Sequence, residues 1–139
     1  MIRIRKFGEG ICYLELNRPE KRNAINWPMM QELSAAIDSV EQMNGARVVL
    51  LRGEGRAFSA GQDQKESAGM DAKSAERRID AYSALYAAIR KLDKPIVAKI
   101  RGYAAGAGLQ VALLADLRIV AASAKIGMTE LQVGSVAIL

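Results

Sequence analysis

The sequence predicts an α/β domain, and three observations support this fold class. Short apolar segments alternate with longer amphipathic segments along the 139 residues, which is the pattern of strands connected by helices. Half of the residues are apolar and a quarter are charged, as in ordinary globular domains. Two loops rich in small residues, at positions 57–63 and 102–108, each follow an apolar segment. We therefore expect one domain over residues 1–139 in which strands and helices alternate.

The first half of the chain contains two strands and one helix by these patterns. Ile11–Leu16 is a short apolar run and is predicted to be a strand. Asn26 is a helix-start signal, and apolar residues at helical spacing then predict an amphipathic helix over Met29–Glu41. Val48–Leu51 is continuous and rich in branched residues, which predicts a strand buried on both faces.

The second half repeats this alternation. Residues 64–72 are polar and small, so we expect a loop, and Ser74 is expected to cap a helix over Ser74–Leu92 with an apolar stripe. Pro95–Ile100 is predicted to be another strand buried on both faces. The glycines at 106 and 108 are expected to open a short helix before a last strand at Leu117–Val120.

Composition excludes several classes of chemistry. The chain has no histidine, which removes Ser-His-Asp and Cys-His catalysis and most zinc sites. Cys12 is the single cysteine and cannot form an internal disulfide, so a reducing, cytoplasmic setting is expected. No apolar run approaches the roughly 20 residues that cross a bilayer, and the N-terminus lacks the apolar core of a signal peptide. We expect neither a membrane partner nor a metal.

The charge balance is mildly basic, with 20 basic and 15 acidic residues and a net charge of +5. Such a surface can attract a polyanion, either the phosphates of a nucleotide-containing ligand or a nucleic acid. Aromatic residues are few, at 5% of the chain, so no stacking platform for single strands is evident. Nucleic acid is therefore not expected to be the principal partner.

The two small-residue loops are the strongest functional signal. Turns of this kind between a strand and a helix can aim two backbone N–H groups at one point and stabilise an oxyanion there. Small residues matter because glycine and alanine let a substrate such as a thioester approach the backbone closely. The pair predicts a site that stabilises negative charge on a carbonyl oxygen.

Four motifs, in order along the chain, carry a resemblance to a known family. They are residues 16–24 (LNRPEKRNA), residues 58–63 (FSAGQD), residues 102–108 (GYAAGAG) with Ala115 and Asp116 behind them, and residues 126–131 (IGMTEL). The chain resembles the crotonase superfamily, the enoyl-CoA hydratases and isomerases. The resemblance implies a crotonase-like ββα spiral and covers the N-terminal part of a typical member, so the C-terminal helical part is expected to be lacking.

The end of the chain is apolar, at Val133–Leu139, and resembles a cut through a core. An exposed apolar end predicts association. The family implies three-fold symmetry, so we expect a homo-oligomer, either a trimer or a dimer of trimers.

The resemblance also implies roles for residues in the two loops. The backbone N–H groups of Gln62 and Ala107 would donate to the oxyanion, with Gly61 and Gly106 as the small residues beside them in contact with substrate. Asp63 follows within the substrate-binding loop and is expected to cap the next helix rather than to act in catalysis.

The resemblance places coenzyme A, as part of an acyl-CoA thioester substrate, next to the first motif. Lys21 and Arg22 would lie by its phosphates. Ala24 and the carbonyl group of Ala60 would lie near its pantetheine and adenine ends. No cofactor is implied beyond the coenzyme A that the substrate itself carries.

The acid and base positions distinguish between reactions of the family. Hydratases of the family use two glutamates to hold and split one water, and Gln110 stands at the position of the first. An amide can orient a water but cannot take its proton near neutral pH. The second carboxylate is present as Glu130, in a local sequence similar to the Δ3,Δ2-enoyl-CoA isomerase branch, where a single glutamate acts.

Three functions follow from these residues. The first is isomerisation of a 3-enoyl to a 2-enoyl thioester, with Glu130 carrying the proton and the two N–H groups holding the enolate oxygen. The second is hydration, with Gln110 positioning the water and Glu130 supplying the proton chemistry. The third is a non-catalytic acyl-CoA-binding or RNA-binding module, which the missing C-terminal part and the basic charge keep open.

Overall fold

The computed structural model describes residues 1–8 and 10–130, and it confirms the α/β class. The elements follow one another in this order: β1 (Ile2–Phe7), β2 (Ile11–Leu16), the 3₁₀ helix η1 (Pro19–Lys21), α1 (Trp27–Glu41), β3 (Val48–Gly53), α2 (Gln64–Ser67), α3 (Ala72–Lys91), β4 (Ile96–Ile100), β5 (Tyr103–Ala105), α4 (Gly106–Leu113), β6 (Leu117–Val120) and β7 (Lys125–Gly127).

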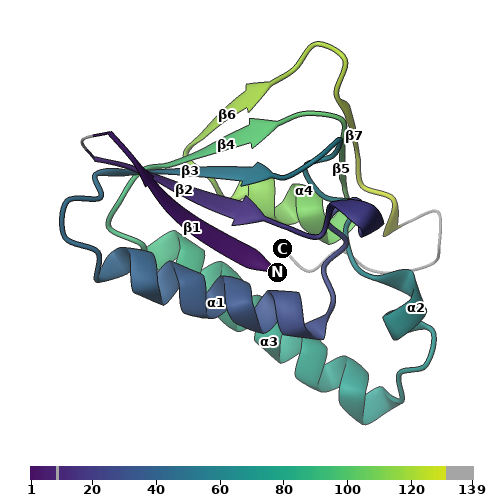
Figure 1. Ribbon diagram of the computed structural model, residues 1–139. Coiled ribbons are helices and arrows are strands. Elements are labelled where there is room, and N and C mark those ends of the chain that lie inside the picture. The colour runs from purple at the N-terminus through teal and green to yellow at the C-terminus, as the bar shows by residue number, and fades with distance from the viewer. Residues whose placement is uncertain (9, 131–139) are drawn as a thin grey trace.

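A five-stranded sheet in the order β1-β2-β3-β4-β6 forms the centre of the described part of the chain (Figure 1). β1 is antiparallel to β2, and the other neighbouring strands are parallel. Parallel neighbours need crossover connections, which α1, α3 and α4 supply after β2, β3 and β4. β5 and β7 form a separate parallel pair that contacts α4.

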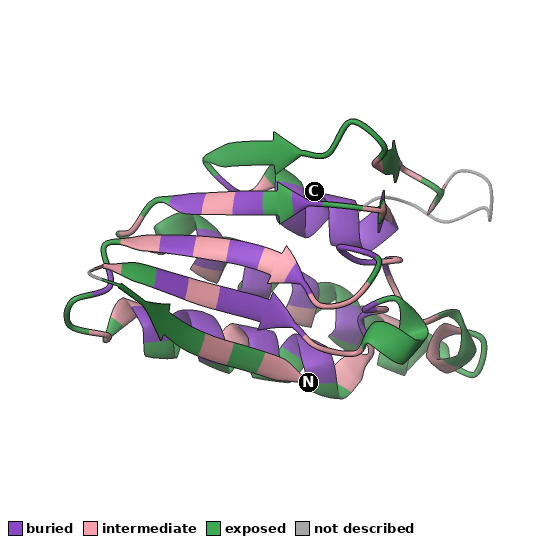
Figure 2. Cartoon of the chain, turned by 45° about the horizontal axis from the view of Figure 1, so that its top comes forward, coloured by how far each residue is buried: buried purple, intermediate pink, exposed green. Residues whose placement is uncertain are grey.

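Helices α1 and α3 lie next to each other across one face of this sheet (Figure 1). Their buried side chains recur at helical spacing, as the sequence predicts, and join the alternate strand residues that point towards them in one core. The buried residues of β3 and β4 on this face include Val49, Leu51, Ile96 and Ala98. The banding along the strands in Figure 2 shows this alternation.

The predicted burial of two strands on both faces is wrong. In β3 and β4 every second residue is buried, whereas Leu50 and Val97 between them are half-buried and Lys99 is exposed. The reason is that α1 and α3 cover the face to which Val49 and Ile96 point. A run of apolar residues shows that a strand contacts a core, but it does not show how completely its second face is covered.

The helix starts follow side-chain caps. α1 begins after Asn26, as predicted, and the Asn26 side chain accepts a hydrogen bond from the Met29 N–H at 3.1 Å. α3 begins earlier than predicted, because Asp71 is its N-cap and accepts from the Ser74 N–H at 2.8 Å. The prediction that Ser74 is the cap is therefore wrong, and Ser74 lies within the first turn.

The sequence patterns do not predict β1, β5, β7 or α2. In β1, Ile2 and Ile4 alternate with arginines, which is the period of a strand. The many charged residues of this segment made that period hard to recognise in the sequence. α2 lies inside the segment interpreted as a loop. It begins after Asp63, whose carboxylate accepts from the Lys65 N–H at 3.1 Å, so the predicted capping role of Asp63 is confirmed.

Two expectations concern the ends and the environment of the chain. No helix among the described residues is both long and apolar enough to span a membrane. The apolar segment Val133–Leu139, on which the expected association rests, lies outside the described residues. The last motif is described as far as Glu130, which includes its proposed catalytic carboxylate.

Candidate active site

The two small-residue loops lie next to each other. The Phe58 N–H donates to the Arg101 carbonyl at 2.9 Å, and the Ser59 N–H donates to the Tyr103 carbonyl at 3.0 Å. The Ser59 carbonyl accepts in turn from the Ala105 N–H at 3.0 Å. Both loops leave the same edge of the sheet because β3 and β4 are parallel neighbours. This arrangement brings the two sets of candidate N–H donors together.

Glycines allow this close approach. Gly61 has a φ of +88°, and a Cβ there would lie 2.7 Å from the Ala105 carbonyl oxygen and 3.4 Å from the Ala107 nitrogen. A Cβ on Gly108 would lie 2.5 Å from the Ser59 Oγ. A larger residue at either position would push the loops apart, so these glycines keep the Gln62 and Ala107 segments adjacent.

Within the described residues, the backbone geometry leaves the N–H groups of Gln62 and Ala107 without an acceptor in their own elements. Ile25 bridges the residues on each side of Gln62: its N–H donates to Gly61 at 2.7 Å and its carbonyl accepts from Asp63 at 3.0 Å. In such a parallel bridge the N–H of the middle residue points away from the partner. Ala107 lies in the first turn of α4, where N–H groups have no acceptor within the helix.

The carboxylate of Glu130 lies against the start of α4. A Cβ on Gly106, the residue before Ala107, would lie 3.2 Å from the Glu130 Oε1. That oxygen accepts a hydrogen bond from the Gln110 Nε2 at 2.8 Å. The Oε2 atom is buried and has no hydrogen-bond partner among the described residues. A buried acceptor without a partner is costly, and here it lies beside the proposed oxyanion site, where it can accept a proton.

Gln110 is held between Tyr86 and Glu130. The Tyr86 hydroxyl donates to the Gln110 Oε1 at 2.7 Å, which turns the amide nitrogen towards Glu130. Burial, together with the neighbouring Tyr82 and Glu130, raises the pKa of Tyr86, so its hydroxyl stays a protonated donor. Gln110 therefore orients the carboxylate, and the sequence pattern gave no sign of the part that Tyr86 plays.

A groove of ≈ 490 Å³ runs beside the first loop and collects most of the predicted binding residues. Four of them line it, Lys21, Ala24, Ala60 and Asp63, together with Gln62, the predicted oxyanion donor. The other lining residues were not predicted to bind substrate: Arg18, Asn26, Gln64, Lys65 and Glu66. The basic members of both sets give the groove the positive charge that suits the phosphates of a nucleotide.

Arg22 does not line this groove. It has a left-handed φ of 51° at the end of η1, and its guanidinium lies 5.5 Å from the ring centroid of Tyr103. It lines a separate cavity of ≈ 390 Å³ together with Arg56 and Tyr103. The structure thus brings Lys21 but not Arg22 to the groove, and a role for Arg22 in binding phosphate stays a prediction.

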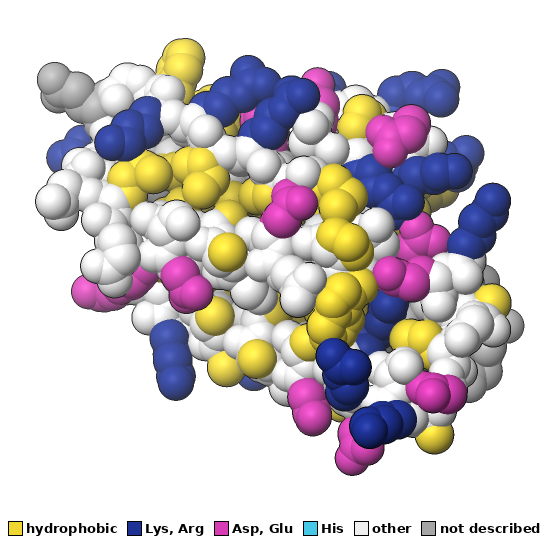
Figure 3. All heavy atoms as spheres, turned by 60° about the horizontal axis from the view of Figure 1, so that its bottom comes forward, with side chains coloured by type: hydrophobic (Ala, Val, Ile, Leu, Met, Phe, Trp, Pro, Cys, Tyr) yellow, Lys and Arg dark blue, Asp and Glu magenta, His cyan; other side chains and the backbone are white. Residues whose placement is uncertain are grey.

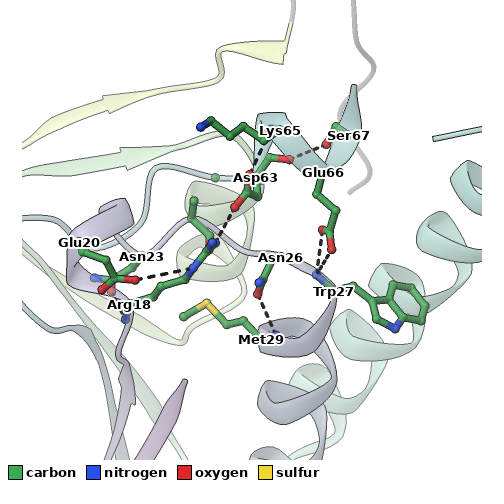
Figure 4. A network of polar contacts seen from close by, with 12 residues as sticks. Arg18, Glu20, Asn23, Asn26, Trp27, Met29, Asp63, Lys65, Glu66 and Ser67 are labelled. Carbon is green, nitrogen blue, oxygen red and sulfur yellow. Dashed lines mark hydrogen bonds and ion pairs between the residues drawn. The ribbon is translucent and has the colours of Figure 1, made fainter. Parts of the chain in front are cut away.

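An ion pair joins the first motif to the first loop. The Arg18 guanidinium donates to the Asp63 Oδ2 at 2.6 Å and to the Ala24 carbonyl at 3.1 Å (Figure 4). The hydrogen bond from Arg18 holds the pKa of Asp63 below its ordinary value. Figure 4 also shows Glu66 accepting from the Trp27 N–H, so α2 is fixed to both the first motif and α1.

Asn23 and Ser59 fix the groove wall, and the sequence analysis missed both. Asn23 is buried with a left-handed φ of 55°, and its amide donates to the carbonyls of Glu54 at 2.8 Å and Ala57 at 2.9 Å. The Ser59 hydroxyl donates to the Asn23 carbonyl at 2.8 Å. An asparagine in a turn segment is the available signal, because asparagine tolerates positive φ better than most residues.

Comparison with known proteins gives consistent matches. Residues 6–138 match a family model described as Enoyl-CoA hydratase/isomerase. The chain is 38% identical over 122 residues to "Probable enoyl-CoA hydratase 2, mitochondrial" of Arabidopsis thaliana, which covers 87% of this chain and 40% of that protein. It is 32% identical over 126 residues to the 2,3-dehydroadipyl-CoA hydratase of Escherichia coli (strain K12). That match covers 91% of this chain and 49% of the Escherichia coli protein.

Solved structures match the fold in the same way. The crystal structure of enoyl-CoA hydratase from Thermoplasma volcanium GSS1 superposes with a TM-score of 0.93 at 36% identity. That match covers 99% of this chain and 54% of the other. The chain therefore spans about half the length of the relatives that it matches.

Proposed function

Because this chain belongs to the enoyl-CoA hydratase/isomerase family and has the crotonase fold over about half of its relatives' length, we propose that it processes enoyl-CoA thioesters. The proposed reaction is isomerisation of a 3-enoyl thioester to a 2-enoyl thioester. The N–H groups of Gln62 and Ala107 hold the enolate oxygen, and Glu130 carries the proton.

The state of Glu130 supports this proposal most directly. Its Oε1 is held by Gln110, while its Oε2 is buried without a partner among the described residues, next to the first turn of α4. The Oε2 atom takes a proton from C2 of the 3-enoyl thioester, and the electrons of that C–H bond form a dienolate. The same carboxyl group returns the proton to C4, so the double bond moves from C3–C4 to C2–C3.

The two amides supply the electrostatic part of the reaction. The negative charge of the dienolate develops on the thioester oxygen, within reach of N–H groups that the folded loops already hold in place. Loss of one oxyanion donor commonly costs about 3–4 kcal/mol of barrier, so the pair can supply much of the rate enhancement. Gly61 and Gly108 are part of this arrangement because they set the distance between the loops.

The surroundings of Gln110 favour a reaction that uses a single catalytic carboxylate, Glu130, over a reaction that uses two. Its Oε1 accepts from Tyr86 and its Nε2 donates to Glu130, so both ends of the amide hold protein groups. An amide does not take a proton from water near neutral pH. A single carboxylate suits a proton shuttle between two carbons of the same substrate.

Hydration is the second candidate, and the names of the relatives favour it. The Arabidopsis, Escherichia coli and Thermoplasma proteins are all named as hydratases. In this reaction Gln110 positions a water for attack on a 2-enoyl thioester, and Glu130 transfers the protons. The oxyanion site is the same in both reactions. They differ in what Gln110 does: it orients Glu130 in the isomerisation and positions the attacking water in the hydration.

The groove supports a coenzyme A thioester as substrate. Lys21 and Lys65 lie along it and can pair with phosphates, while the small residues Ala24 and Ala60 leave room beside the loop. The proposed reaction needs no cofactor apart from the coenzyme A that the substrate carries. Arg18 lies there too, but its guanidinium is already paired with Asp63.

A side-by-side assay of a 3-enoyl-CoA and a 2-enoyl-CoA tests the proposal. We expect isomerisation to be faster than hydration, and Glu130→Gln to lower it by about 10²–10⁴-fold, the usual contribution of a general base. Glu76→Gln, at an exposed position on α3, removes a carboxylate away from the site and is the matched control.

Hydration faster than isomerisation would overturn the isomerase assignment, as would full activity in Glu130→Gln. Gln110→Glu then decides between the two candidates, because it restores a second carboxylate. A large gain in hydration in that variant supports the hydratase reaction, and no gain counts against it. Binding of acyl-CoA without either reaction would support the non-catalytic alternative.

A further inference from the structure

A stripe of buried polar side chains runs along α3. It consists of Arg78, Tyr82 and Tyr86, which follow one another at intervals of four residues and therefore lie on one face of the helix. All three are buried. Tyr86 bonds to Gln110 and belongs to the site already described. From there the stripe continues for about 12 Å along the helix axis to Arg78, at 1.5 Å per residue.

A cavity of ≈ 270 Å³ lies at the Arg78 end of this stripe. Its lining combines apolar and charged residues: Trp27, Glu66, Met70, Ser74, Arg77 and Arg78. Glu66 also lines the groove proposed for coenzyme A, so the cavity and the groove are neighbours. Figure 3 shows basic, acidic and apolar side chains lying beside one another towards one end of the helical face.

Two buried hydrogen-bond donors along this stripe have no acceptor in the part of the chain that the structure describes. The Arg78 side chain is 7% exposed; its NH2 donates to the Glu66 Oε2 at 2.6 Å, but its Nε has no partner among the described residues. The Tyr82 hydroxyl is likewise buried without a partner in that part of the chain. Burial raises the pKa of Tyr82, so the hydroxyl keeps its proton. An unpaired guanidinium nitrogen is costly to bury unless a ligand satisfies it, and of these two residues Arg78 is the one that lines the cavity.

The cavity lining also has an excess of positive charge. Glu66 is the single carboxylate among the described residues that line it, and this side chain already accepts from Arg78 and from the Trp27 N–H at 2.9 Å. Arg77 adds a second cation, with its guanidinium 5.8 Å from the centroid of the Trp27 ring. A ligand that completes this lining must therefore bring hydrogen-bond acceptors and negative charge.

We propose that the cavity receives the far end of the substrate's acyl chain and that this end carries a carboxylate. The substrate class is then the coenzyme A monothioester of an unsaturated dicarboxylic acid. The carboxylate accepts from the Arg78 Nε and faces Arg77, while Trp27 and Met70 contact the methylene groups before it. This assignment rests on the proposed function, because it takes the thioester to lie at the Gln62 and Ala107 N–H groups.

Calorimetric binding of unreactive coenzyme A thioethers tests this assignment without any turnover. The thioethers carry hexyl to dodecyl chains, each ending in a carboxylate or in its methyl ester. At the best chain length we expect the carboxylate to bind about tenfold more tightly or better, as charge-assisted hydrogen bonds do. Arg77→Gln, which leaves the buried Arg78–Glu66 pair intact, reduces that preference several-fold. Arg90→Gln, an exposed arginine on the same helix, keeps it.

Equal binding of the carboxylate and the methyl ester at every length would overturn the assignment. So would a preference that is unchanged in Arg77→Gln, or a free dicarboxylate that binds as tightly as the thioether. If the preference holds but no isomerisation or hydration is found, the proposed reaction fails while the substrate assignment stands.

Discussion

The contact between the two loops at Gly61 predicts that Gly61→Ala is damaging in two separable ways. Gly61 has a φ of +88°, and an L-residue in a left-handed conformation costs roughly 1–2 kcal/mol. The new Cβ would also lie 2.7 Å from the Ala105 carbonyl oxygen. A backbone atom cannot rotate away as a flexible side chain can, so one of the loops must move.

Gly45 offers a matched control for the backbone term. Its φ is +87°, and a Cβ there would meet nothing within 4 Å. Gly45→Ala therefore carries the conformational cost without the collision. Overpacking typically costs about 1–3 kcal/mol, so we expect Gly61→Ala to lower the free energy of unfolding by that much more than Gly45→Ala does.

Urea denaturation of both variants measures the difference, and steady-state rates on the enoyl-CoA substrates measure its effect on the site. Movement of either loop displaces the Ala107 N–H from the Gln62 N–H, and loss of one oxyanion donor lowers rates by about 10²–10³-fold. Gly45→Ala should keep its activity. Equal stability of the two variants, or normal activity in a folded Gly61→Ala, would refute the argument that this contact sets the geometry of the site.

Three further predictions concern stability, reactivity and association. The hydrogen bond from Arg18 lowers the pKa of Asp63 below 3.8, so the ion pair stabilises the fold above about pH 4 and this stabilisation is lost as the pH falls through the lowered pKa. Urea unfolding should thus show the advantage of the wild type over Asp63→Asn shrinking towards acid, and a constant difference would contradict this. Cys12 is fully buried and burial raises the pKa of its thiol, so a thiol reagent should label it far faster in urea than in buffer; equal rates would mean that the strand opens in the native state. On the edge strand β6, Leu117 is 64% and Ile119 is 59% exposed, so Leu117→Lys should reduce self-association in sedimentation velocity, and unchanged sedimentation would exclude this edge from any interface.

The sequence was sufficient to predict those features that local patterns determine. Helical spacing of apolar residues identified α1 and α3, and small residues after two strands identified both loops of the site. These features can be read from neighbouring residues because they depend on backbone conformation and on a period of burial. β5 and β7 consist of three residues each, too few for a period, and they form only because the two segments meet.

The parts of the site that the sequence did not predict are contacts between distant segments. Asn23 was not identified because its role is to bond to carbonyls of Glu54 and Ala57, more than thirty positions away. Ser59 is an ordinary loop serine until its hydroxyl meets Asn23 and its Cβ meets Gly108. Composition cannot show such pairings, since each depends on the completed fold.

The position of Gln110 illustrates both kinds of information. The sequence alone showed that an amide stands where a second carboxylate is expected, and this suggested a one-carboxylate reaction. The structure adds that Tyr86, from α3, holds the amide in the orientation that presents its nitrogen to Glu130. The same helix face continues through Tyr82 to Arg78 and the cavity beyond. One helix therefore contributes side chains to both the Gln110–Glu130 pair and the lining of the cavity, although these side chains lie eight residues apart in the sequence.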